Sequence, residues 1–212
     1  MMHKLITEGN FSYIEVGSGK PILILHGLMG GLSNFHALTD YFSVNGYRVI
    51  IPELPIYTTS LIKTNVKGFA QYLHDFIAFK GYEDVILLGN SLGGHIGLYH
   101  TKFYRDKVKA LVLTGSSGLY ESAMGSGYTK RSDYEVIKKK VQDVFFDPAI
   151  ATKAIVDDVY ETVNDRKKLV KTLAIAKSAI RHNMAKDLPS INIPTCVIWG
   201  KNDTVTPPKV AE

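Results

Sequence analysis

The sequence predicts an α/β protein built on a mostly parallel, doubly wound sheet. Two observations favour this fold class. Short, continuous apolar runs are typical of strands buried on both faces, and amphipathic helical patterns lie between them. Strands that alternate with helices pair in parallel through right-handed crossovers, so that helices cover both faces of the sheet. A chain of 212 residues fits one such domain with an insertion.

Strands and helices follow one another regularly over the first half of the chain. The runs HKLITE and FSYIEV flank Gly9-Asn10, a turn dipeptide, and predict a β-hairpin. Apolar side chains form one helical stripe between residues 64 and 80, and Gly81 follows as a C-cap. A second helix is expected to begin near Leu92. Buried strands are predicted at PILILHG, YRVIIPEL, DVILLGN, KALVLTG and PTCVIWG.

The alternation stops after Gly118, and the next strand-like run begins only near Ile193. Three helical patterns lie between, preceded by Asp133, by Asp147-Pro148 and by Asp165. About seventy residues of helix between two core strands predict a lid. We therefore divide the chain into a core at 1–118, a helical lid at 119–188, and a return to the core at 189–212, with the last strand and its loop.

Composition and charge exclude several functional classes. The lysines behind the net charge of +5 are scattered, apart from clusters at 138–140 and 166–168 that are typical of solvated helix faces, so we expect no nucleic-acid partner. No signal peptide and no apolar run of roughly 20 residues occurs, so we expect no membrane association. The single cysteine, Cys196, lies in a run typical of a buried strand, and we expect a reducing, cytoplasmic compartment. Histidines and carboxylates show no metal-ligand spacing, so we expect neither a metal nor a cofactor.

The stretch Gly89-Asn90-Ser91-Leu92-Gly93 is a G-x-S-x-G motif between a predicted strand and a predicted helix. This strand–turn–helix context is where the motif presents a nucleophilic serine. The two outer glycines allow a turn too sharp for side chains, and the turn raises the Ser91 hydroxyl above the strand ends. We therefore predict Ser91 to be a catalytic nucleophile.

A second glycine-rich turn, His26-Gly27-Leu28-Met29-Gly30-Gly31, ends the first strand of the parallel run. A turn at this place can aim backbone N–H groups at an oxyanion that develops beside the serine. We predict that the donors are the N–H groups of Leu28 and of Leu92, the residue after the nucleophile. The alternative is that these glycines only permit tight packing at a strand end.

A carboxylate follows the last predicted strand. Asp203 lies in the loop WGKNDTVTP. Because parallel strands all end on one side, we expect it at the same sheet edge as Ser91, where it would orient a histidine and stabilise the imidazolium. The alternative is an Asn-Asp turn in which Asp203 hydrogen-bonds its own backbone.

In their order, HGLMGG, GNSLGG and WGKNDTVTP resemble motifs of the α/β-hydrolase superfamily, specifically of members with a helical lid after the sixth core strand. The resemblance covers essentially the whole chain. It implies that Ser91 is the nucleophile, Asp203 the triad acid, and Leu28 and Leu92 the oxyanion donors. GNS-x-GG is also similar to hydrolases that cleave carbon–carbon bonds in ring-fission products, although their oxyanion loop is usually Ser-Gly-Pro-Gly. The stretch PELPIYTTS departs from the common Asp-x-x-Gly-x-Gly-x-Ser loop, which implies a different pocket entrance.

The resemblance implies a catalytic histidine after the acid and one further strand, whereas all seven histidines precede Asp203. We expect His95 to pack beneath the site, because its helix leads away from the serine hydroxyl. His26 is expected to shape its turn, and His182 to lie at a solvated helix end. We therefore expect the catalytic histidine, with an eighth strand and a closing helix, to lie outside this sequence.

These features predict a serine hydrolase that cleaves a small carboxylic ester with an apolar acyl part through an acyl-enzyme. A thioester or a vinylogous C–C bond is the alternative substrate. If 212 residues are the natural length, the second hypothesis is a non-catalytic relative that binds a small hydrophobic ligand under its lid. A homodimer that completes the unfinished sheet is the third.

Overall fold

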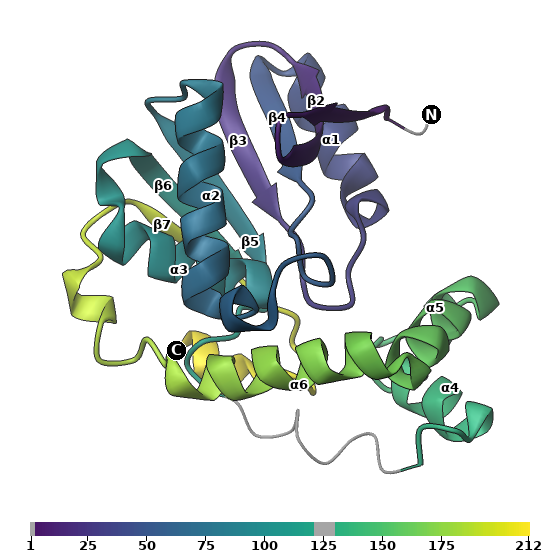
Figure 1. Cartoon of the computed structure of the whole chain (residues 1–212). Helices are drawn as coiled ribbons and strands as arrows, with labels where there is room; N and C mark the ends of the chain where they lie inside the picture. The colour runs from purple at the N-terminus through teal and green to yellow at the C-terminus, as the bar shows by residue number, and fades with distance from the viewer. Residues whose placement is uncertain (1–2, 121–129) are drawn as a thin grey trace.

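The computed structural model describes residues 3–120 and 130–212. Its centre is a seven-stranded sheet with the order β1-β2-β4-β3-β5-β6-β7 (Figure 1). The first hairpin and the β2–β4 pair are antiparallel, and every other pair is parallel, which confirms the predicted α/β class. The strands are β1 (Leu5–Glu8), β2 (Phe11–Gly17), β3 (Lys20–Leu25), β4 (Tyr47–Pro52), β5 (Val85–Asn90), β6 (Val108–Thr114) and β7 (Thr195–Ile198).

Helices cover both faces of this sheet. The longer ones are α1 (His36–Val44), α2 (Val66–Lys80), α3 (Leu92–Phe103), α4 (Tyr134–Gln142), α5 (Lys153–Asn164) and α6 (Arg166–Arg181). The short 3-10 helices are η1 (Leu32–Phe35), η2 (Leu61–Lys63), η3 (Arg105–Lys107), η4 (Pro148–Ile150), η5 (Leu188–Ser190) and η6 (Pro208–Ala211). Side chains of α2 and α3 pack into one hydrophobic cluster, whereas Phe35 and Phe42 pack into a second cluster on the other face.

Strand β3 shows why the central strands are apolar at every position. Ile22 and Ile24 belong to the cluster on the α1 side, and Leu23 and Leu25 belong to the cluster on the α2–α3 side. Successive side chains of a strand point to opposite faces, so a strand covered on both sides needs a continuous apolar run.

The C-terminal end of α2 follows the predicted signal, whereas no cap was predicted for its N-terminal end. The Asn65 side chain accepts a hydrogen bond from the Gly68 N–H, and Gly81 ends the helix with a φ of 65°. Between these ends, Phe69, Leu73 and Phe76 are at most 1% exposed. The amphipathic stripe therefore packs α2 against the core and positions the loop that precedes the helix.

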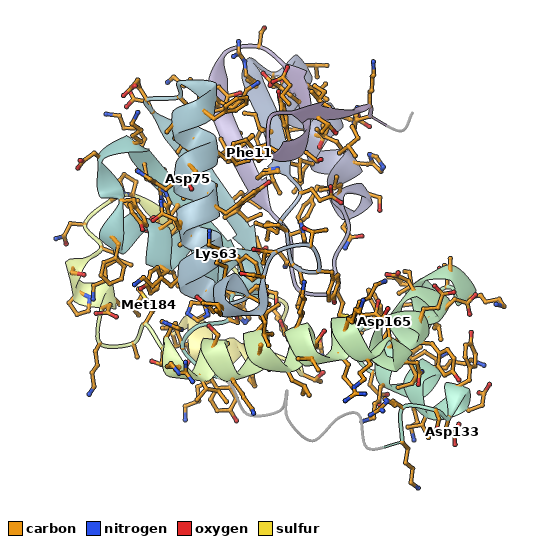
Figure 2. All side chains as sticks on the ribbon, in the orientation of Figure 1. Phe11, Lys63, Asp75, Asp133, Asp165 and Met184 are labelled. Carbon is orange, nitrogen blue, oxygen red and sulfur yellow. The ribbon has the colours of Figure 1, made fainter. Side chains whose placement is uncertain are left out.

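In the described part of the stretch between β6 and β7 there are three α-helices, and two of their caps are as predicted. The carboxylates of Asp133 and Asp165, labelled in Figure 2, each accept two backbone N–H groups at the start of α4 and α6. The prediction that Asp147-Pro148 begins the middle helix is wrong. Asp147 caps only the short η4, and α5 begins at Lys153 with Thr152 as its cap.

Strand β7 differs from its prediction as a buried strand. All four of its residues are exposed, including Cys196, which has a free thiol. The physical reason is position, because β7 is an edge strand that pairs only with β6 among the described residues. Burial of such a run depends on what lies beside it and not on its composition alone.

Helix α1 lies in a region for which no element was predicted. Phe35, Leu38 and Phe42 nevertheless recur at helical spacing there. Thr39 is fully buried and donates a hydrogen bond to the Phe35 carbonyl, 2.9 Å away.

Within the described ranges, no helix combines the length and apolar character that a membrane crossing requires.

Candidate active site

Ser91 occupies the one residue between β5 and α3, and its backbone is strained. Its φ of 52° is the only positive value for a non-glycine residue in the described ranges. Such a conformation costs roughly 1–3 kcal/mol and persists only where surrounding contacts impose it. Here the Ser91 N–H donates to the Thr114 carbonyl at 3.1 Å, and its carbonyl accepts from the N–H of His95 and of Ser117. The turn is thus held by β6, by α3 and by the loop after β6.

The glycines around Ser91 allow backbone segments to meet. A β-carbon on Gly93 would lie 2.0 Å from the Leu25 carbonyl oxygen, at the end of β3. A β-carbon on Gly89 would lie 2.5 Å from the Gly93 carbonyl carbon. Both distances are shorter than any van der Waals contact, so the first turn of α3 can pack onto the strand ends only with glycine here.

The turn after β3 packs beside Ser91. The Gly30 N–H donates to the Gly27 carbonyl at 3.2 Å, which makes Leu28 and Met29 the central residues of this turn. A β-carbon on Gly27 would lie 3.3 Å from Cβ of Ser91. Within the described ranges, the N–H groups of Leu28 and Leu92 have no hydrogen-bond acceptor. The structure therefore brings both predicted oxyanion donors to the two turns that meet at Ser91.

His26 links this turn to the loop after β4. Its Nε2 accepts from the Leu54 N–H at 3.2 Å, so its Nδ1 carries the proton and donates to the Gly27 carbonyl at 2.8 Å. Burial lowers the pKa of His26, a residue that is 6% exposed. A neutral imidazole with both nitrogens bonded in this way shapes the turn.

Asp203 lies beyond the end of β7, across the end of β6 from Ser91. Its Oδ2 would be 3.1 Å from a β-carbon on Gly115, the residue that follows Thr114 and β6. Its Oδ1 accepts the N–H groups of Val205 and Thr206 at 2.9 Å, and its Oδ2 accepts the Thr206 hydroxyl at 3.0 Å. The carboxylate thus forms the turn that the sequence left open as an alternative. It also lies at the sheet edge that carries Ser91.

No described histidine ring is placed to act on the serine. Among the described residues, no imidazole nitrogen hydrogen-bonds with Ser91 or Asp203. His95 is fully buried, its Nε2 donates to the His182 carbonyl at 2.8 Å, and burial lowers its pKa to about 4. His182 ends α6, where its Nδ1 lies 3.0 Å from the Ser178 hydroxyl. Both therefore serve packing between α3 and α6.

Two supporting residues were missed by sequence reasoning. Asn90 Nδ2 donates to both the carbonyl and the hydroxyl oxygen of Thr114, which ties the residue before Ser91 to β6. Thr206 is 4% exposed and donates from its hydroxyl to Asp203 and to the Gly115 carbonyl, at 3.0 and 3.2 Å. The signal for Thr206 was its place three residues after an aspartate in a turn. No local signal pointed to the partner of Asn90.

The fold and these motifs have known counterparts. A family model described as alpha/beta hydrolase fold matches residues 20–154. A crystal structure of MGS-MChE2, an α/β hydrolase enzyme from the metagenome of lagoon sediments at Mar Chica, Morocco, is 58% identical with a TM-score of 0.78. The match covers 98% of this chain and 80% of that one.

Two named relatives are more distant. A 2-hydroxy-6-oxononadienedioate/2-hydroxy-6-oxononatrienedioate hydrolase from Pseudomonas sp. is 24% identical over 94% of this chain and 77% of its own length. Lipase 1 from Psychrobacter immobilis is 28% identical over 93% of this chain and 67% of its own length. The family model spans most of the chain, and the sheet order agrees with it. The chain therefore belongs to the α/β hydrolase fold family.

Proposed function

We propose that this protein is a serine hydrolase that cleaves a small carboxylic ester or a related acyl bond through an acyl-enzyme on Ser91. The observation that carries the proposal is the strained Ser91 backbone at the junction of β5 and α3, with a glycine turn packed against it. In α/β hydrolases a strained turn of this kind lifts the nucleophile's hydroxyl clear of the strand ends, where a substrate can reach it.

In this mechanism the Ser91 hydroxyl attacks the substrate carbonyl, and its proton passes to a histidine. The N–H groups of Leu28 and Leu92 stabilise the oxyanion, and loss of one such donor costs about 2.7–4 kcal/mol of transition-state stabilisation. The tetrahedral intermediate collapses to the acyl-enzyme and releases the alcohol, which takes the proton from the histidine. Water then attacks the acyl carbonyl, the acid is released, and the histidine returns a proton to the Ser91 oxygen. Asp203 orients that histidine and stabilises the imidazolium that forms when it takes the proton.

An apolar acyl group fits the surroundings of the turn. Leu28 and Leu92 belong to the large hydrophobic cluster, and Met29 packs against both this cluster and the one formed by α4 and α5. Apolar linings with a few placed polar groups are typical of small-molecule sites. We propose no metal and no cofactor for the reaction. The exposed thiol of Cys196 fits a reducing, cytoplasmic compartment, where such a thiol stays free.

The second candidate is hydrolysis of a carbon–carbon bond. It is favoured by the names of relatives such as the hydrolase from Pseudomonas sp. and by Asn90, which precedes Ser91 in the GNS-x-GG motif. Turnover of a vinylogous 1,5-diketone acid compared with that of a p-nitrophenyl ester separates the two. A kcat/KM at least about a hundredfold higher for the diketone would replace the ester proposal.

The test of the nucleophile is the intact mass of the purified protein before and after a fluorophosphonate probe. We expect a single adduct that the Ser91→Ala variant lacks. Asp203→Asn keeps the Oδ1 acceptor of the turn, so we expect an unchanged fold with labelling slowed by orders of magnitude.

Absence of an adduct on the folded wild-type protein would contradict the enzyme proposal. Binding of an apolar ligand without labelling would then support the non-catalytic alternative. Labelling that rises with protein concentration, together with a matching rise in molecular size, would support a homodimer that completes the site.

A further inference from the structure

The loop between β4 and α2 touches the oxyanion turn in two places. This loop, residues 53–60, contains all but the first residue of the PELPIYTTS stretch (52–60) that departs from the family pattern. Through Leu54 it reaches His26, which bonds to the Gly27 carbonyl. Through Tyr57 it reaches Met29, because the Tyr57 hydroxyl lies 4.0 Å from the Met29 sulfur. A shift of the loop would therefore displace contacts with both Gly27 and Met29 of the turn.

Helix α6 holds the same loop from the other side. The Lys171 ammonium donates to the carbonyls of Tyr57 and Thr59, at 2.7 and 2.6 Å. The next residue, Thr172, has its hydroxyl 3.4 Å from the Tyr57 hydroxyl. Hydrogen bonds from a charged donor are roughly twice as strong as neutral ones, and two that converge on one loop fix its path.

Helix α6 is itself anchored to the core. Ser178 is 3% exposed, and its hydroxyl accepts from the Val66 N–H at 2.9 Å, at the start of α2. Thr172, Ile175 and Ala179 are also buried. Figure 1 shows α6 lying across the edge of the sheet where β3 ends. The helix therefore provides a fixed support from which Lys171 reaches the loop.

We propose that Lys171 is a positioning residue for the oxyanion turn, acting through the carbonyls of Tyr57 and Thr59 and the contact of Tyr57 with Met29. This inference rests on the proposed function for its catalytic consequence. Its structural part, the link between Lys171 and the turn, holds or fails independently of any chemistry.

The test compares Lys171→Met with Lys177→Met, since Lys177 is an exposed lysine on the same helix. The first measurement is hydrogen exchange of the Gly30 amide, which is bonded within the turn. We expect exchange about tenfold faster in Lys171→Met and unchanged in Lys177→Met. The second is the rate of Ser91 labelling by a fluorophosphonate, which we expect to fall about tenfold in Lys171→Met alone.

Two further variants keep the test decisive. Lys171→Arg retains a charged donor and should restore most of both quantities. Tyr57→Phe removes the hydroxyl near Met29, while Lys171 can still donate to the carbonyls of residues 57 and 59. We expect it to slow labelling by about threefold, even if Lys171→Met does not fold.

Unchanged Gly30 exchange in a folded Lys171→Met would overturn the inference. Faster exchange with an unchanged labelling rate would overturn it as well, because the turn would then be loosened without effect on the oxyanion donors. If the wild-type protein is not labelled, the proposed function fails, and Gly30 exchange alone decides whether Lys171 positions the turn.

Discussion

Single atoms decide whether the turn at Ser91 can form. Gly93 and Gly97 are both helical glycines of α3, yet their surroundings differ. A β-carbon on Gly93 would overlap the Leu25 carbonyl oxygen, whereas one on Gly97 would lie 3.2 Å from Cδ1 of Leu111. Backbone at the end of β3 cannot move aside without disturbing the sheet, but a leucine methyl can shift.

We predict that Gly93→Ala lowers the free energy of unfolding by at least about 3 kcal/mol and abolishes labelling of Ser91. Gly97→Ala should change stability by less than about 1 kcal/mol, because the helix propensity of alanine offsets the tight contact. Urea denaturation with the labelling assay measures both. Equal stability of the two variants would mean that the approach of α3 to β3 is adjustable.

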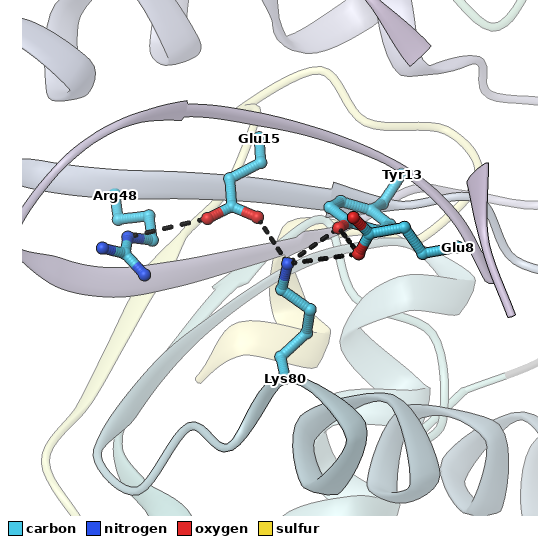
Figure 3. A network of polar contacts seen from close by, with 5 residues as sticks. All are labelled: Glu8, Tyr13, Glu15, Arg48 and Lys80. Atoms are coloured by element: carbon cyan, nitrogen blue, oxygen red, sulfur yellow. Dashed lines mark hydrogen bonds and ion pairs between the residues drawn. The ribbon is translucent and has the colours of Figure 1, made fainter. Parts of the chain in front are cut away.

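At the scale of elements, a polar network joins the end of α2 to the first hairpin (Figure 3). The Lys80 ammonium lies 2.9 Å from a Glu15 carboxylate oxygen and 2.7 Å from the Tyr13 hydroxyl, which donates to Glu8. Arg48 of β4 lies 3.6 Å from Glu15. The side chains of Lys80 and Glu15 are only 16% and 18% exposed. Burial lowers the pKa of Lys80, but bonds to Tyr13 and Glu15 outweigh it, so that pKa is raised.

Because this pair is largely shielded from water, we predict that Lys80→Met destabilises the protein by about 1–3 kcal/mol. Part of the loss is the cost of leaving Glu15 with fewer partners. The matched control is Lys109→Met, which removes an ion pair with Asp84. The side chains of Lys109 and Asp84 are both more than 60% exposed. We expect Lys109→Met to lower the free energy of unfolding by less than about 0.5 kcal/mol. Thermal melts at low and high salt measure both, and a similar loss in the two variants would contradict the role assigned to burial.

At the scale of the whole molecule, two buried histidines make stability depend on pH. Burial lowers the pKa of His95 to about 4 and that of His100 to about 3. Both values lie below the unfolded value of about 6.5. The unfolded chain therefore takes up protons below that pH while the folded protein does not. Stability is complete above pH 6.5 and is lost as the pH falls toward 4, by up to roughly 1.4 kcal/mol per pH unit for each histidine.

Urea denaturation at pH 7, 6 and 5 measures this slope. Both ring nitrogens of His100 are buried without a partner among the described residues. We predict that His100→Phe leaves stability at pH 7 unchanged or higher and lowers the slope between pH 6.5 and 5, to which the buried His95 and His26 still contribute. The lowered pKa values of Asp157 and Asp165 act only below about pH 4 and leave this window unaffected. An unaltered slope in His100→Phe would contradict the prediction, because it would mean that His100 takes up its proton over the same pH range in the folded and the unfolded protein.

Features that depend on neighbouring residues could be predicted from the amino-acid sequence alone. Alternating apolar runs and helical stripes predicted the α/β class, Asp133 and Asp165 predicted helix starts, and the glycines beside Ser91 predicted a sharp turn between a strand and a helix. Each of these features rests on contacts within a few positions of the chain, where residue type and spacing are sufficient.

Only the tertiary structure decided what depends on distant residues. It left Cys196 exposed because β7 lies at the edge of the sheet. In the folded protein, His95 hydrogen-bonds to His182, which is 87 positions away. Lys171 hydrogen-bonds to Tyr57, in the loop after β4, across 114 positions. No local pattern encodes these partners, because they are set by how the sheet, α3 and α6 pack together.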